Sequence, residues 1–246
     1  VLLKAGKFVT FEGIEVIESK DNFNITRGHL FGFAEPYTHV GVLAGYAFPK
    51  IADVWVGVVN GWDLHTDNNY GKTFLTKIGL NFGSMLWGAL SFSRGAEQND
   101  NTNYARTSLD STWFVKPHEK VTIGLQQNIG EEEGLSTHPT RLGGAAHWYG
   151  LGIQPKVDIC KQFSVGSRYE WFSDLDGPRT TVRHVAQTVS LTPTFNLTES
   201  LMFRLEYRYD WSGYDKTVYG GLYETSDGVY SKGETSTVST EFVYKF

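Results

Sequence analysis

Several features that would point to a familiar class of protein are missing from this chain of 246 residues. The single cysteine, Cys160, excludes an intrachain disulfide. No run of about 18 apolar residues occurs, which excludes a transmembrane helix. The net charge of −5 argues against nucleic-acid binding. The chain starts at Val1 without a signal peptide, which leaves open whether it is a processed protein or a fragment.

What the chain does have is a strict alternation of polar and apolar residues. The stretch RLEYRYDW, residues 204–211, places four charged residues on one parity. One leucine and three aromatic residues occupy the other parity. A period of two indicates a β-strand, because successive side chains of a strand point to opposite faces. This strand would have one ionic face and one oily, aromatic face.

About twelve segments share this pattern, each of roughly 8–12 residues, the length that a tilted strand needs to cross a bilayer. They are residues 2–9, 37–48, 53–60, 72–82, 84–94, 106–116, 120–129, 146–157, 162–172, 183–195, 200–211 and 235–246. No segment shows a sustained period of 3.6, so no long helix is expected.

The connections between these segments alternate in length. Short ones lie at 49–52, 83, 117–119, 158–161 and 196–199, and long ones at 10–36, 61–71, 95–105, 130–145, 173–182 and 212–234. Short periplasmic turns and long extracellular loops are the plan of an outer-membrane barrel. Both termini then lie on the periplasmic side, which requires an even number of strands.

A soluble β-sandwich would also show alternation, with its apolar faces inside. Three observations favour the barrel: the ionic faces are rich in glycine and small polar residues, aromatics cluster at strand ends, and the loops alternate in length. We therefore expect an all-β fold, an antiparallel up-and-down transmembrane β-barrel of about 12 strands. Residues 1–246 would form this single domain.

The last strand ends in TEFVYKF, with Phe242, Tyr244 and Phe246 at alternate positions. This triplet is similar to the C-terminal signature of bacterial outer-membrane barrels. The resemblance implies that these three residues are an assembly signal, read by the barrel-assembly machinery.

Five further pieces resemble the β-barrel porin-2 family of outer-membrane proteins, whose function is largely unassigned. They are KAGKF at 4–8, YTHVGV at 37–42, VVNGWD at 58–63, RYEWFSDLDGPR at 168–179 and FRLEYRYDWS at 203–212. The resemblance covers most of the chain and implies a bacterial outer-membrane location and a channel, without naming a solute. Family members are usually longer at the N-terminus, so N-terminal residues would be missing if the chain is a fragment.

The charged strand faces supply the candidate pore-lining residues. A strand of Thr and Ser hydroxyls lies between two charged strands, leaving room for arginine to reach glutamate. These charges would line a constriction that selects ions or small anionic solutes, or would merely fill and rigidify a narrow lumen. The candidates are Lys77, Arg106, Asp110, Arg168, Glu170, Arg204, Glu206, Arg208 and Asp210.

Two connections carry more specific expectations. The long loop 10–36 mixes apolar residues with glycine and arginine, and its apolar residues need shelter, so we expect it to fold into the lumen mouth. In the NGWD motif at 60–63, Asn-Gly indicates a turn, and Trp62 fits an aromatic girdle at the membrane interface.

Signatures of catalysis and cofactor binding are missing. There is no G-x-S-x-G motif, no histidine beside a recognisable nucleophile, and no paired-carboxylate site. The absence of C-x-x-C-H means that this chain itself attaches no c-type haem. We predict no catalytic residue, no metal site and no cofactor.

The sequence therefore favours a porin or channel for passive diffusion of ions and small hydrophilic solutes. Two alternatives stay open: a non-conducting barrel scaffold that holds a partner protein, and, less favoured, an outer-membrane enzyme. The expected partners are outer-membrane lipid and lipopolysaccharide, the barrel-assembly machinery and, by analogy with porins, further copies of the chain. No nucleic acid is expected.

Overall fold

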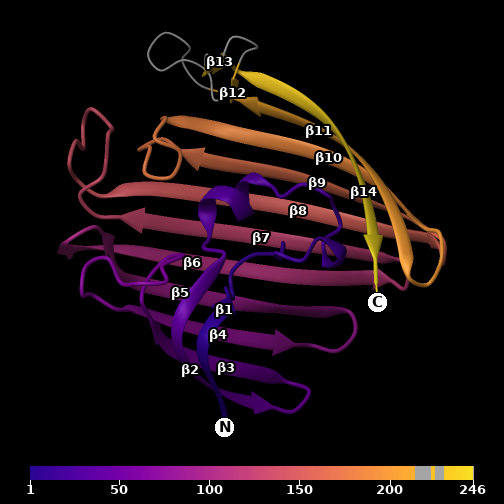
Figure 1. Cartoon of the computed structure of the whole chain (residues 1–246), viewed down its shortest axis with the longest axis horizontal. Helices are drawn as coiled ribbons and strands as arrows, with labels where there is room; N and C mark the ends of the chain where they lie inside the picture. Colours follow the sequence, from indigo (N-terminus) through magenta and orange to yellow (C-terminus); the bar gives the residue numbers. More distant parts are fainter. Residues whose placement is uncertain (214–222, 225–229, 246) are drawn as a thin grey trace.

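The fold is a single antiparallel sheet in which each strand pairs with the next along the chain. The computed structural model describes residues 1–213, 223–224 and 230–245. Within these residues, a 12-stranded sheet has the order β1 to β11 followed by β14 (Figure 1). Its strands are β1 (Leu2–Val9), β2 (Thr38–Phe48), β3 (Ala52–Val59), β4 (Thr73–Asn81), β5 (Leu86–Gln98), β6 (Asn101–His118), β7 (Val121–Glu132), β8 (Ala146–Cys160), β9 (Phe163–Asp174), β10 (His184–Asn196), β11 (Leu201–Ser212) and β14 (Glu234–Tyr244). The short strands β12 (Tyr223–Glu224) and β13 (Tyr230–Lys232) pair with each other.

The two faces of the sheet reverse the usual arrangement of a soluble protein. On β7, Gln126 and Asn128 are buried, whereas Leu125 and Ile129 are 38% and 39% exposed. The same reversal recurs along β9, β10 and β11. A β-sandwich would bury the apolar residues instead. The burial pattern therefore supports an outward apolar face and an inward polar face, as in a transmembrane barrel.

Connections at one end of the sheet, here called the short-turn end, are tight. The opposite, long-loop end carries the connections 60–72, 133–145 and 175–183. The prediction of a long loop at 95–105 is wrong. β5 continues to Gln98, β6 begins at Asn101, and the two strands meet in a two-residue turn. Asp100 supplies the left-handed backbone of this turn, with φ of 54°. The polar residues there break the alternation, but their backbone groups continue to pair. Most of the loop predicted at 212–234 lies outside the described residues.

A further long connection, residues 10–37 between β1 and β2, is here called the inner segment. It crosses the concave side of the sheet in front of the middle strands (Figure 1). It contains a short 3₁₀ turn, Ser19–Asp21, and a one-turn π-helix, Leu30–Ala34, which contacts β7, β8 and β9. Leu30 and Ala34 are fully buried. The prediction that loop 10–36 folds inward is confirmed.

Small residues on the inner face make room for this segment. A Cβ on Gly150 would lie 2.2 Å from a Leu30 methyl carbon, and one on Gly166 would lie 2.3 Å from the Phe23 carbonyl oxygen. The space beside the glycines of the ionic faces is thus filled by backbone and apolar side chains of the inner segment.

The outer strands of the sheet are β1 and β14. Among the described residues, no hydrogen-bonded ladder joins them, so each has one free edge. Neither helical turn within those residues is long and apolar enough to cross a membrane.

Candidate functional site

The predicted pore-lining residues all lie on the inward parity of their strands. Most are buried beneath the inner segment and do not face open water. Exposed fractions are 1% for Asp110, Arg168 and Arg204, 0% for Glu170 and Glu206, and 4% for Asp210. The side chains of Arg106, Arg208 and Lys77 are 14%, 15% and 23% exposed. Their part in conduction stays a prediction.

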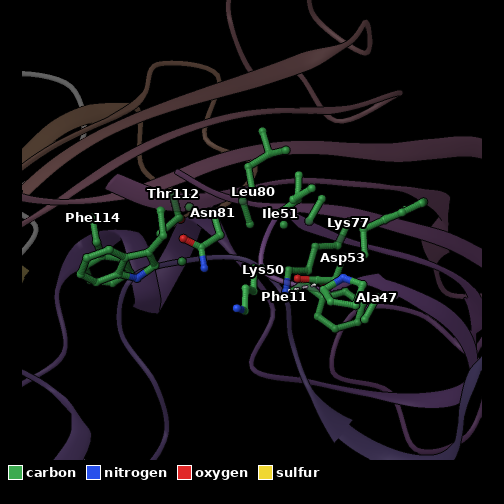
Figure 2. Close-up of a pocket in the computed structure, with 18 residues that line it drawn as sticks. Phe11, Ala47, Lys50, Ile51, Asp53, Lys77, Leu80, Asn81, Thr112 and Phe114 are labelled. Carbon is green, nitrogen blue, oxygen red and sulfur yellow. Dashed lines mark ion pairs between the residues drawn. The ribbon is translucent and has the colours of Figure 1, made fainter. Parts of the chain in front are cut away.

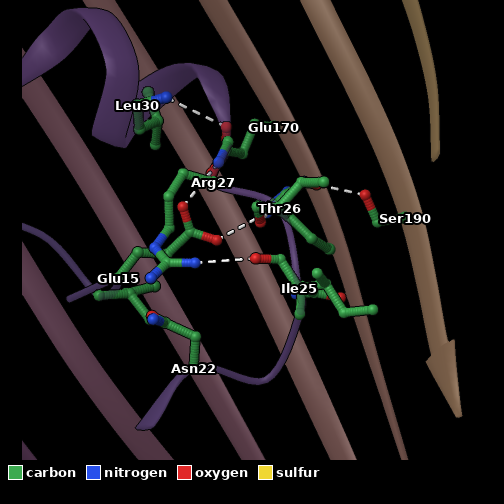
Figure 3. Close-up of polar contacts among 12 residues, drawn as sticks. Glu15, Asn22, Ile25, Thr26, Arg27, Leu30, Glu170 and Ser190 are labelled. Carbon is green, nitrogen blue, oxygen red and sulfur yellow. Dashed lines mark hydrogen bonds and ion pairs between the residues drawn. The ribbon is translucent and has the colours of Figure 1, made fainter. Parts of the chain in front are cut away.

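Arg168 on β9 binds the middle of the inner segment. Its Nη1 donates to Glu15 Oε1 at 2.6 Å and to the carbonyl oxygen of Thr26 at 2.6 Å. Its Nη2 donates to Ser190 on β10 at 2.9 Å. Figure 3 shows this region, with Glu15 at the left, Thr26 in the middle and Ser190 at the right. The carboxylate partner of Arg168 therefore comes from the inner segment.

Two arginines of β11 bind the same segment through its backbone. Arg204 Nη1 donates to the carbonyl oxygen of Asn22 at 2.9 Å, and its Nη2 to that of Ser19 at 2.9 Å. Arg204 also forms an ion pair with Glu241 on β14. Arg208 Nη1 donates to the carbonyl oxygen of Arg27 at 2.5 Å. Together, Arg168, Arg204 and Arg208 hold residues 19–27 against the inner face of the sheet.

Two glutamates on the inner face of the sheet, Glu170 and Glu206, accept hydrogen bonds from the inner segment. Glu206 accepts from the amide of Ile25 at 2.6 Å and from the Thr192 hydroxyl at 2.9 Å. Glu170 accepts from the amide of Leu30, where the π-helix begins, at 3.1 Å (Figure 3). Gly28 permits this approach, because a Cβ there would lie 2.2 Å from the Glu170 carboxylate oxygens. The hydroxyl strand β10 leaves space, as expected, but inner-segment backbone occupies it.

The inner segment also brings carboxyl groups that sequence reasoning missed. Glu12 and Glu35 are 5% and 2% exposed and lie beside Asp110 of β6. Burial, reinforced by the nearby Asp110 charge, raises the pKa of Glu12 to about 8. Burial also raises the pKa of Glu35 well above its usual range. Only the acidic character of residues 12–35 in a loop expected to fold inward could have pointed to them.

At the long-loop end, cations stack on tryptophans. The guanidinium of Arg106 lies 4.9 Å from the ring centroid of Trp62, and that of Arg179 lies 4.7 Å from it and 5.3 Å from Trp148. Burial, with the nearby Arg106, lowers the pKa of Arg179 to about 10. Trp62 packs against the buried cluster of Trp148 and Leu30. Its interpretation as a membrane girdle residue is wrong, because its ring faces the lumen mouth.

Open spaces lie on both sides of the inner segment. At the short-turn end, a cavity of about 510 Å³ is lined by Phe11, Gly13 and the ion pair of Lys77 with Asp53, whose Nζ and Oδ2 are 3.1 Å apart (Figure 2). At the long-loop end, a cavity of about 530 Å³ is lined by Arg27, Arg208 and aromatic residues of the segment. The inner segment therefore forms part of the wall of both spaces.

The predicted assembly-signal residues lie at the end of β14. Phe242 and Tyr244 are 68% and 66% exposed on the outward face, and Phe246 lies outside the described residues. Within the part of the chain that the structure describes, no group of three or more His, Cys, Asp or Glu side chains is placed to hold a metal ion.

Comparison with known proteins gives one family and several structures. The family model described as Putative beta-barrel porin-2, OmpL-like matches residues 1–246. No curated protein matches the sequence.

Solved structures with a similar fold have low sequence identity. The anion-selective porin from Comamonas acidovorans has a TM-score of 0.69 at 9% identity, over 99% of this chain and 74% of that one. In-vitro folded OmpT, an outer-membrane protein of Vibrio cholerae, has 0.63 at 13%, over 99% and 76%. The outer-membrane channel DcaP of Acinetobacter baumannii has 0.63 at 9%, over 98% and 71%. At such identities the likeness concerns the fold.

Proposed function

Because the chain belongs to the Putative beta-barrel porin-2, OmpL-like family, we propose that it forms a channel for passive diffusion of ions and small hydrophilic solutes. The protein is an outer-membrane β-barrel of the porin type from Gram-negative bacteria. The family is described as porin-like and two structural neighbours are titled porins, so we propose no enzymatic activity.

The observation that carries the proposal is the arrangement of the polar lumen. Charged and hydroxyl side chains face inward from β4 to β11, and the inner segment lies between two open cavities of about 510 and 530 Å³. Solutes would enter at the long-loop end, pass the inner segment and leave at the short-turn end. The inner segment would be the constriction.

We propose that selectivity is weak. The inward arginines of β9 and β11 have carboxylate partners: Glu15 for Arg168, Glu241 for Arg204 and Asp210 for Arg208. Paired charges of both signs create little net potential along a pathway. One structural neighbour is named an anion-selective porin, which makes anions the first solutes to test.

Single-channel recording in a planar bilayer tests this function. The purified, folded protein should give discrete openings, with a reversal potential near zero under a salt gradient. Arg168→Ala, Arg204→Ala and Arg208→Ala should each move the reversal potential toward cation selectivity if the side chain lines the path. Variants that conduct with unchanged selectivity would contradict the pore-lining role of these residues.

The filled lumen favours one second candidate. Arg168, Glu170 and Glu206 are at most 1% exposed and are hydrogen-bonded to the inner segment. A barrel closed in this way would serve as a non-conducting scaffold for a partner protein. Electrical silence from protein shown to be folded and inserted would favour the scaffold over the channel. We also propose that the protein contacts lipopolysaccharide, the barrel-assembly machinery and further copies of the chain.

A further inference from the structure

Three buried carboxyl groups lie within electrostatic reach of one another where the inner segment crosses β6 and β7. Glu35 Oε2 and Asp110 Oδ2 both accept from the side-chain nitrogen of Gln126, at 2.7 and 2.9 Å. Two carboxylates that share one amide nitrogen lie close together. Glu12 is the third member, and the three residues are here called the carboxyl cluster.

The partners of Glu12 are neutral. Its Oε1 accepts from the Ser93 hydroxyl at 3.2 Å, and its Oε2 from the Ser108 hydroxyl at 2.7 Å. Asn128 on β7 donates to Ser108 and to Asp110, both at 3.3 Å. Hydroxyl and amide groups support a carboxylate but supply no compensating charge.

Backbone packing forces the cluster together. Gly13 has φ of +90°, and its amide donates to Asp110 Oδ1 at 3.1 Å. A Cβ on Gly13 would lie 2.1 Å from Glu35 Oε1, and this oxygen is buried without a hydrogen-bond partner. The inner segment therefore stacks Glu35 directly over Gly13 and Asp110.

The charged and titratable groups on the surrounding elements already have partners. His39 of β2, which lines a small cavity together with Glu12, is hydrogen-bonded through Nδ1 to the carbonyl oxygen of Gly61 at 3.1 Å. Arg106 of β6 pairs with Glu132 of β7, Arg168 of β9 pairs with Glu15, and Lys77 of β4 pairs with Asp53 of β3. Glu15, like Asp110, adds negative potential at Glu35. Among the residues that the structure describes, the cluster is thus an excess of buried acid without a hydrogen-bonded cation.

We propose that the carboxyl cluster is a proton-operated latch, which holds the inner segment in the lumen while protonated and releases it when the protons are lost. This inference rests on the proposed channel function for its effect on conduction, but the docking of the segment can be measured separately.

The direction of the pH effect follows from the geometry. Docking removes Glu12 and Glu35 from water and places them beside Asp110, which raises the pKa of Glu12 to about 8 and that of Glu35 well above its usual range. In the released segment both return to an ordinary value of about 4.3. The docked state therefore binds more protons, so docking is favoured in acid and weakens as pH rises toward and through about 8.

Thiol labelling at Ser91 reports docking. Ser91 is 3% exposed, and its hydroxyl donates to the carbonyl oxygen of Phe11 at 3.1 Å, so the inner segment covers it. The rate at which a methanethiosulfonate reagent labels Ser91→Cys, with Cys160→Ser, is measured in nanodiscs between about pH 5 and about pH 9. The exposed native Cys160 gives the pH dependence of an uncovered thiol. We expect the ratio of the two rates to rise at least about tenfold with pH.

Isosteric variants test the cluster itself. Glu12→Gln with Glu35→Gln cannot lose protons, so the Ser91→Cys labelling ratio should stay low and flat. Glu18→Gln, an exposed residue of the same segment, is the matched control and should keep the pH response. If the double variant does not fold, Glu12→Gln and Glu35→Gln are made separately; each removes one of the two titrating groups and should reduce the pH response of the labelling ratio.

Conductance in the same pH series separates the two proposals. Labelling and open probability that rise together support latch and channel. Labelling that rises in a protein silent at every pH keeps the latch and overturns the channel. Steady conductance with a flat labelling ratio overturns the latch and leaves the channel. A wild-type pH response in the glutamine variant also overturns the latch.

Discussion

At the scale of single residues, the arginines of the lumen bind backbone carbonyl oxygens of the inner segment as well as carboxylates. Arg168, Arg204 and Arg208 each donate to at least one carbonyl oxygen of the inner segment. A planar guanidinium has five donors, which lets one side chain bind a carboxylate and a carbonyl together. Charge alone would not fix the segment, because a lysine would lack these directed contacts.

Arg168→Ala should release the middle of the inner segment. The substitution leaves Glu15, 3% exposed, as a buried charge without its partner, and breaking a buried pair costs about 3–5 kcal/mol. We expect tryptic cleavage after Arg27 to accelerate by roughly two orders of magnitude or more, since about 1.4 kcal/mol corresponds to tenfold.

The matched control is Arg94→Ala. Arg94 pairs with Glu133 at the exposed long-loop end, with side chains 47% and 33% exposed, and such pairs contribute little. Its cleavage rate should equal that of the wild type. Equal rates for Arg168→Ala and the wild type would mean that Arg168 does not hold the segment.

At the scale of elements, close packing of the inner segment against the strands depends on small residues on the strands. Glycines of β7, β8 and β9 lie under Ile14, Leu30 and Phe23. The space they leave is filled by atoms that belong to the same chain, so extra volume there must displace the segment.

Gly166→Ala is the sharpest test of this fit. The added Cβ would lie 2.3 Å from the Phe23 carbonyl oxygen, a backbone atom that cannot rotate away. Overpacking of this kind costs about 1–3 kcal/mol, and we expect cleavage after Arg27 to accelerate by roughly tenfold or more. Gly32→Ala, with no atom within 4 Å of its Cβ, should leave the rate unchanged. An unchanged rate in Gly166→Ala would show that the segment adjusts freely.

The elements differ in how far sequence alone could predict them. Alternation over 120–129 and 162–172 was sufficient for β7 and β9, because each strand has one face toward polar contacts and one toward apolar surroundings. The apolar residues of loop 10–36 indicated its inward fold. The contacts of Glu15 with Arg168 and of Gly13 with Asp110 join residues 153 and 97 positions apart, and no local pattern encodes such pairs. The prediction for Trp62 was wrong for the same reason, because tertiary packing places its ring. The loop predicted at 95–105 was wrong for a local reason: its polar residues break the alternation, although their backbone groups pair in a hairpin.

At the scale of the whole molecule, the free edges of β1 and β14 determine whether the sheet is stable in lipid. Each unpaired backbone group in hydrocarbon costs several kcal/mol, so an open edge is not stable there. The first and last strands of an up-and-down sheet with an even number of strands run antiparallel, and their outward faces carry Leu3 and Phe242, 79% and 68% exposed.

We expect this chain to close in a bilayer by pairing β1 with β14. Leu3→Cys is combined in turn with Thr240→Cys, Phe242→Cys and Tyr244→Cys, all with Cys160→Ser, since neighbouring strands place facing Cα atoms about 4.5–5.5 Å apart, within disulfide reach. One outward pair should form an intramolecular disulfide in high yield after insertion. Val243→Cys, of opposite parity on β14, is the control and should not bond to Leu3→Cys. Disulfides that form only between copies would contradict closure and show that the edges pair with a second chain.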